Sequence, residues 1–73
     1  MPAPELPPPT LHTLLTTADV ARIARTGEST VRYWRHLGTG PRGFKVGRRV
    51  LYRPADVEAW LQAQEAADAG GAA

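Results

Sequence analysis

The chain has no cysteine among its 73 residues, so neither a disulfide bond nor a thiolate metal site can stabilise its fold. No apolar run approaches the ~18 residues of a membrane-spanning helix, and no basic residue opens an apolar leader at the N-terminus. These absences exclude disulfide-stabilised and membrane-spanning classes, and we expect a cytoplasmic protein that does not bind a membrane. A chain of this length folds as one small domain.

Residues that could carry catalysis are also scarce. The two histidines, His12 and His36, are isolated, and no nucleophile in the sequence has a plausible base partner. We therefore expect no enzymatic activity, no metal and no cofactor.

Acidic residues are nearly absent from the middle of the chain. All nine basic residues lie between Arg22 and Arg53, where Glu28 is the one acid, so this segment carries +8 while the whole chain carries +2. Eight of the nine are arginine, whose planar guanidinium forms paired hydrogen bonds with phosphates and base edges. This concentration of charge predicts a polyanionic partner.

Proline and glycine mark the two ends of the chain. Five of the seven prolines fall within residues 1–9, a composition that forms neither a helix nor a sheet interior. We interpret residues 1–10 as a flexible proline-rich arm and residues 11–67 as the folded domain. Residues 68–73, which are small and glycine-rich, are expected to form a flexible tail.

A first helix is expected to begin after Thr16. Thr16 and Asp19 have the spacing of a capping box, in which each side chain accepts the backbone N–H of the other residue. Val20, Ile23 and Ala24 follow at the spacing of one helix face, which predicts that they form the buried stripe.

A second helix is expected after a tight turn, with Gly27 in the left-handed conformation that ends the first helix and Ser29 as the new cap. Val31 and Trp34 form its inward edge, with or without Leu37. Its other side is polar and basic: Thr30, Arg32, Tyr33, Arg35 and His36. Two short helices joined in this way are typical of a helix-turn-helix.

The stretch GTGPRG, residues 38–43, fits the pattern G-x-G-x-x-G of a dinucleotide-binding loop. That loop must follow a strand and open a helix, whereas this one follows a helix and leads into β-prone residues. We therefore interpret its glycines as residues that shape a loop.

A β-hairpin is expected beyond this loop, because two short β-prone runs flank Gly47. A three-residue tip pairs Val46 with Val50 and Phe44 with Tyr52, and it places all four apolar side chains on one face. We prefer this register to a two-residue tip, which scatters the apolar set.

A third helix is expected to begin at Pro54, with Val57, Trp60 and Leu61 as its inward stripe. Trp34 and Trp60 are interpreted as core residues. The expected fold is therefore mainly α-helical with a small β-hairpin wing.

Four stretches resemble the excisionase-type, MerR-like winged helix-turn-helix family: TTADVA (residues 16–21), STVRYW (29–34), GPRGFKVGRRV (40–50) and DVEAWL (56–61). The resemblance covers residues 14–64. It implies that the second helix enters the major groove of DNA and that the wing reaches the adjacent backbone or minor groove.

Candidate DNA contacts follow from this resemblance and from the charges. Arginine can donate two hydrogen bonds to guanine O6 and N7, and Arg32 is expected on the first turn of the second helix, where base edges are met. The candidates on that helix are Ser29, Thr30, Arg32, Tyr33, Arg35 and His36. Those on the loop and wing are Arg42, Lys45, Arg48, Arg49 and Arg53. Tyr33 either donates a hydrogen bond to the DNA backbone or packs partly against the domain. Arg22 and Arg25 either solvate the first helix or contact a phosphate.

We predict a protein that binds and bends double-stranded DNA, with additional copies of itself on repeated sites. The resemblance favours an excisionase, or recombination directionality factor, that assists an integrase in excising a phage or mobile element. A small transcriptional regulator would use the same domain, and a protein-interaction adaptor is the alternative from another class. MerR regulators continue into an effector domain that this chain lacks, so we expect no small-molecule effector.

Overall fold

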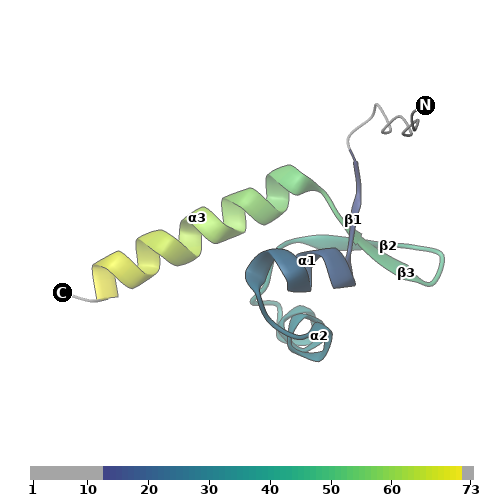
Figure 1. The fold of residues 1–73 in the computed structure, drawn as a ribbon, viewed down its shortest axis with the longest axis horizontal. Helices are drawn as coiled ribbons and strands as arrows, with labels where there is room; N and C mark the ends of the chain where they lie inside the picture. Colours follow the sequence, from purple (N-terminus) through teal and green to yellow (C-terminus); the bar gives the residue numbers. More distant parts are fainter. Residues whose placement is uncertain (1–12, 72–73) are drawn as a thin grey trace, which may run out of the picture.

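The computed structural model describes residues 13–71, so the predicted arm, residues 1–10, lies outside the described residues. The elements follow in the order β1 (Leu15–Thr16), α1 (Thr17–Ala24), α2 (Glu28–Leu37), β2 (Gly43–Val46), β3 (Arg49–Tyr52) and α3 (Pro54–Gly71). The small antiparallel sheet has the strand order β1-β3-β2; α1 and α2 lie together beside it, and α3 leads away from it (Figure 1). The predicted fold class, mainly α-helical with a hairpin wing, is confirmed.

Helix α1 begins with the predicted capping box. The Thr16 hydroxyl accepts the Asp19 N–H at 3.1 Å, and the Asp19 carboxylate accepts the Thr16 N–H at 2.9 Å. The predicted buried stripe is wrong at Ile23, which is 46% exposed, because α1 packs against α2 on one side and the sheet on the other. Its buried edge therefore lies between these neighbours, at Val20 and Ala21.

The turn between α1 and α2 differs from the prediction. Arg25, with φ 59° and ψ 47°, is the left-handed residue that ends α1, and the Thr26 N–H donates to the Ala21 carbonyl at 2.9 Å. Gly27 is extended and occupies the N-cap of α2, so Ser29 lies inside the helix and is not its cap. The chain turns as soon as the buried edge of α1 ends, two residues before the glycine.

Helix α2 directs Val31 into the core, where it is 1% exposed, and Trp34 packs against that core. Leu37 does not extend this edge, since it is 51% exposed at the last turn. Gly38 is left-handed with φ 77° and ends α2, and the Thr39 N–H donates to the Trp34 carbonyl at 2.9 Å.

The predicted hairpin register is wrong. A two-residue tip pairs Val46 with Arg49 and Gly43 with Tyr52, and Gly47 at the first tip position has φ 63°. Gly43 lies opposite Tyr52 because a Cβ there would come within 2.7 Å of the Tyr52 ring. The register that places Gly43 against the Tyr52 ring is therefore adopted, although the predicted register would put all four apolar side chains on one face.

The two faces of the sheet therefore carry different residues. Side chains directly opposite one another share a face, and successive ones alternate. Val50 and Tyr52 face the core, whereas Phe44 and Leu51 face away, with the Arg53 guanidinium 5.5 Å from the Phe44 ring centroid.

A third strand, β1, was not predicted from the sequence. It pairs Leu15 with Tyr52 and Thr16 with Leu51, and so covers the second edge of β3. Leu15 packs against the core from this position.

Helix α3 begins at Pro54 and turns Val57 and Leu61 toward the core, as predicted. It continues to Gly71, beyond Ala67, where the sequence predicted the domain to end. Each residue from Gln62 to Gly70 is exposed, and this part of the helix extends away from the rest of the domain (Figure 1). The buried core that α3 completes consists of Val20, Ala21, Val31, Tyr52 and Val57.

Replacing Gly43 by alanine should lower the free energy of unfolding by about 1–3 kcal/mol, because the added methyl group meets the buried Tyr52 ring. Urea unfolding followed by tryptophan fluorescence measures the change. Gly70→Ala is the matched control, since a Cβ there meets nothing within 4 Å. Equal midpoints for the two variants would contradict this packing.

The capping box should make stability depend on pH through Asp19. The hydrogen bond from the Thr16 N–H is the main cause that lowers the pKa of Asp19 below 3.8, opposed by partial burial and aided by the Thr16 hydroxyl and Arg22. A lowered pKa stabilises the fold above pH 3.8, and this stabilisation is lost as the pH falls through the folded-state value.

Wild type should accordingly be more stable than Asp19→Asn at neutral pH, and the difference should shrink well below pH 3.8. Urea unfolding at both pH values measures it. Asp68→Asn removes the same charge from the exposed part of α3 and serves as the control. A difference for Asp19→Asn that is independent of pH would show that the carboxylate charge is not involved.

Candidate nucleic-acid interface

A groove runs between α2 and the β2–β3 hairpin. Val50 and Tyr52 of β3 line it together with basic residues from two separate elements. The lining residues are Thr17, Arg32, Arg35, His36, Arg48, Val50 and Tyr52. Four of the predicted contacts, Arg32, Arg35 and His36 from α2 and Arg48 from the hairpin tip, therefore meet at one place.

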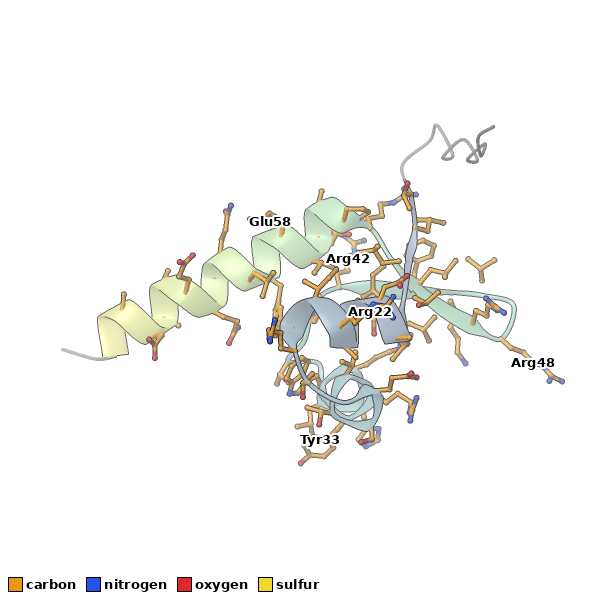
Figure 2. The ribbon with its side chains drawn as sticks, in the orientation of Figure 1. Arg22, Tyr33, Arg42, Arg48 and Glu58 are labelled. Carbon is orange, nitrogen blue, oxygen red and sulfur yellow. The ribbon has the colours of Figure 1, made fainter. Side chains whose placement is uncertain are left out.

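The packing of α2 decides which of its side chains border this groove. Because a helix turns 100° per residue, burial of Val31 places Arg32 and His36 one turn apart on the flank beside the hairpin. Tyr33 follows on the outermost side of the helix and is 59% exposed. Figure 2 shows Tyr33 pointing away from the sheet and Arg48 at the far end of the hairpin.

Glu28 lies beside this groove at the first position of α2. Its carboxylate Oε1 is 3.5 Å from Nη1 of Arg32, and 62% of the Arg32 side chain remains exposed. Glu28 also borders a neighbouring hollow together with Arg49 and the residues that open α1, Thr17 and Ala18.

A second hollow continues the basic surface from Arg35 into the glycine-rich loop. It is lined by Arg35, Gly38, Gly40, Pro41, Arg42 and Gly43. Arg35 borders both the groove and this hollow, so Arg42 joins the same surface.

Two tryptophans hold the glycine-rich loop in place. The Trp34 and Trp60 ring centroids are 5.1 Å apart, and Nε1 of Trp60 donates to the Thr39 carbonyl at 2.9 Å. A Cβ on Gly40 would come within 2.8 Å of the Trp34 Cβ, so the loop backbone lies directly against the indole. Both tryptophans are half-buried and neither belongs to the buried core, against which Trp34 packs, so the prediction of two core tryptophans is not met in full.

The hairpin brings only some of its basic residues to the groove. Lys45 is opposite Val50 and therefore lies on the groove side of the sheet. Arg49 and Arg53 lie on the opposite face, where Arg53 stacks on Phe44. The two-residue tip causes this separation, because it puts Arg48 in the turn and Arg49 in the strand.

The remaining predicted residues lie near the groove without lining it. Ser29 is exposed and Thr30 is half-buried in the first turn of α2. On α1, Arg22 forms an ion pair with Asp19. Thr17 lines the groove, although it was not singled out from the sequence. Its position directly after the helix cap could have indicated a binding role, because the N–H groups that open a helix lack intrahelical partners.

Residues 13–71 contain neither a cluster of metal ligands nor a membrane-spanning helix. Within residues 13–71, no group of three or more histidine, cysteine, aspartate or glutamate side chains could hold a metal ion. None of the helices there is sufficiently long and apolar to cross a bilayer.

Comparison with known proteins gives one match. A family model described as a helix-turn-helix domain matches residues 14–65. Neither the curated proteins nor the solved structures contain a significant match. The matched residues include α1, α2, the hairpin and the packed part of α3, and therefore every residue that lines the groove.

Proposed function

The chain belongs to the helix-turn-helix domain family, which implies DNA binding, and from this premise we propose that it recognises double-stranded DNA through the groove between α2 and the hairpin. The meeting of Arg32, Arg35, His36 and Arg48 around one groove is the observation that carries the proposal. These residues come from two elements that are separated in the sequence by the glycine-rich loop, and both are exposed.

In this proposal α2 enters the major groove, which is wide enough to admit a helix. Because α2 begins at Glu28, Arg32 lies in its second turn, and its exposed guanidinium reaches a guanine edge. His36 follows one turn later on the same flank. Tyr33 and Ser29, which lie on the outward side, contact the sugar-phosphate backbone.

The remaining basic residues bind phosphates on either side of this helix. Arg35 and Arg42 border the hollow in the glycine-rich loop, and Arg48 and Lys45 occupy the hairpin on the groove side. Phosphate contacts fix the position of a protein on DNA without reading its sequence. Arg53 is not assigned to the interface, because it stacks on the opposite face of the sheet.

The small size of this surface favours a function that uses several copies. A single module of this kind buries roughly 600–1,000 Å² on DNA, and five or six phosphate contacts give a log-log salt slope near −5. One copy is then a modest, weakly selective binder, and useful occupancy comes from adjacent copies on repeated sites, with DNA bent between them. The exposed part of α3 offers a surface for such neighbours.

We propose on this basis that the protein is an accessory factor of the excisionase type, which shapes DNA for an integrase. The support for this finer role is the resemblance of its helix and wing stretches to that family, together with a surface suited to cooperative binding.

Arg32→Ala should weaken binding to a preferred duplex by about 1–3 kcal/mol and relax base preference at one position, because a guanine contact is lost. Arg48→Ala should weaken binding to all duplexes alike and make the salt slope shallower by about 0.9, because one phosphate contact is lost. Fluorescence anisotropy titrations at several salt concentrations measure both effects.

Arg53→Ala is the matched control, since it removes an arginine from the other face of the sheet. Its affinity should remain within about twofold of wild type once unfolding curves confirm that it is folded, because no phosphate contact is lost. If Arg53→Ala weakened binding as much as Arg48→Ala, the proposed surface would be wrong.

Gel-shift titration on a fragment identified by footprinting near the protein's own gene should show a ladder of cooperative complexes, because neighbouring copies stabilise one another. Addition of the integrase encoded by the same element should yield excision that depends on this protein. A single 1:1 complex would contradict the cooperative role, and bound DNA without stimulated excision would favour a transcriptional regulator.

A further inference from the structure

Glu28 is an exception in the basic part of the chain. It is the only acid between Arg22 and Arg53, and it lies beside Arg32 on the side of α2 that borders the groove. Glu28 also lines a neighbouring hollow to which Arg49 contributes. An acid at this position lowers the attraction of the surface for DNA, which raises the question of what it contributes.

A structural role alone does not account for this placement. The Glu28 and Arg32 side chains are 52% and 62% exposed, and ion pairs between exposed groups contribute little to stability. A carboxylate also favours the positive end of a helix, as Asp19 in α1 and Asp56 in α3 do, but Asp56 forms no ion pair with an arginine among residues 13–71, so this role does not require one.

We propose that Glu28 is a positioning residue that directs Arg32 toward base edges and keeps it from phosphates, so that selectivity rises while affinity for arbitrary DNA falls. This inference rests on the proposed DNA-binding function. It concerns how the interface distinguishes one duplex from another.

The argument follows from the geometry of the guanidinium. Phosphates recur along every duplex, so an unrestrained arginine finds one at any register, whereas guanine edges occur only at particular positions. The Glu28 carboxylate Oε1 lies 3.5 Å from Nη1 of Arg32 and leaves the other donors of the guanidinium available for a base edge. A phosphate that approached Arg32 from this side would meet the negative charge of Glu28. Specificity is a difference between affinities, and a group that disfavours the wrong mode of binding raises it.

The test uses the full chain and two probes: a duplex enriched by wild type from a random-sequence pool, and a scrambled duplex of the same composition. Glu28→Gln should bind the scrambled duplex about threefold to tenfold more tightly at about 0.1 M salt, with a salt slope steeper by about 0.9, because Arg32 gains a phosphate. Binding to the enriched duplex should change by less than about threefold, so the ratio of the two affinities falls.

Two further variants separate the causes. In an Arg32→Ala background, Glu28→Gln should change both affinities by less than about twofold, because the proposed effect acts through Arg32. Glu58→Gln removes the same charge from α3, where Glu58 accepts a hydrogen bond from Gln62, and should leave the affinity ratio unchanged.

The inference is overturned if Glu28→Gln leaves the ratio unchanged, or if its effect persists without Arg32. It is also overturned if Glu28→Gln weakens binding to the enriched duplex and changes the preferred base, because Glu28 would then read cytosine directly. Failure of wild type to enrich any duplex would instead reject the proposed function itself.

Discussion

The ring of Tyr52 is the point on which the sheet, the core and the groove all depend. It is 1% exposed and pairs with Leu15 on one side and Gly43 on the other, so three strands meet at this residue. Burial of a large side chain contributes about 1.5–3 kcal/mol, a considerable share of the stability of so small a domain. Tyr52 also lines the groove, together with basic residues of α2 and of the hairpin tip.

This arrangement reconciles a high density of charge with a small core. The arginines that line the groove are exposed to water, so the free protein does not pay the desolvation free energy of burying their charges. The Trp34–Trp60 pair fixes the backbone of the glycine-rich loop that carries Arg42. The Arg42 side chain itself stays exposed. Packing thus determines where the charges converge, and the charges themselves contribute little to the fold.

Much of the helical structure could be predicted from the sequence, because its signals are local. The Thr16–Asp19 capping box and the inward positions of Val57 and Leu61 depend only on spacing along one helix. The prediction that Ile23 is buried was wrong, because which side of α1 is buried depends on the elements that flank this helix. The left-handed turn fell at Arg25 because packing, and not the nearest glycine, decided where the helix ended.

The sheet was less predictable because its determinants are not local. Its register followed from the contact between Gly43 and Tyr52, and β1 is too short to show an alternating pattern. The register in turn decided which wing arginines reach the groove, so Arg48 and Arg49 could not be distinguished from the sequence. The composition therefore predicted that the site is basic, but it did not predict which residues line it.

The negative charge of helix α3 affects the orientation in which the protein approaches a DNA duplex. Asp56, Glu58, Glu65 and Asp68 give residues 54–71 four negative charges and no positive one, and the helix leads away from the groove (Figure 1). In the field of DNA this end is repelled while the arginine-rich end is attracted, which produces a torque on the approaching molecule. Collisions should then occur mostly with the groove leading, so productive encounters are more frequent than a net charge of +2 alone would suggest.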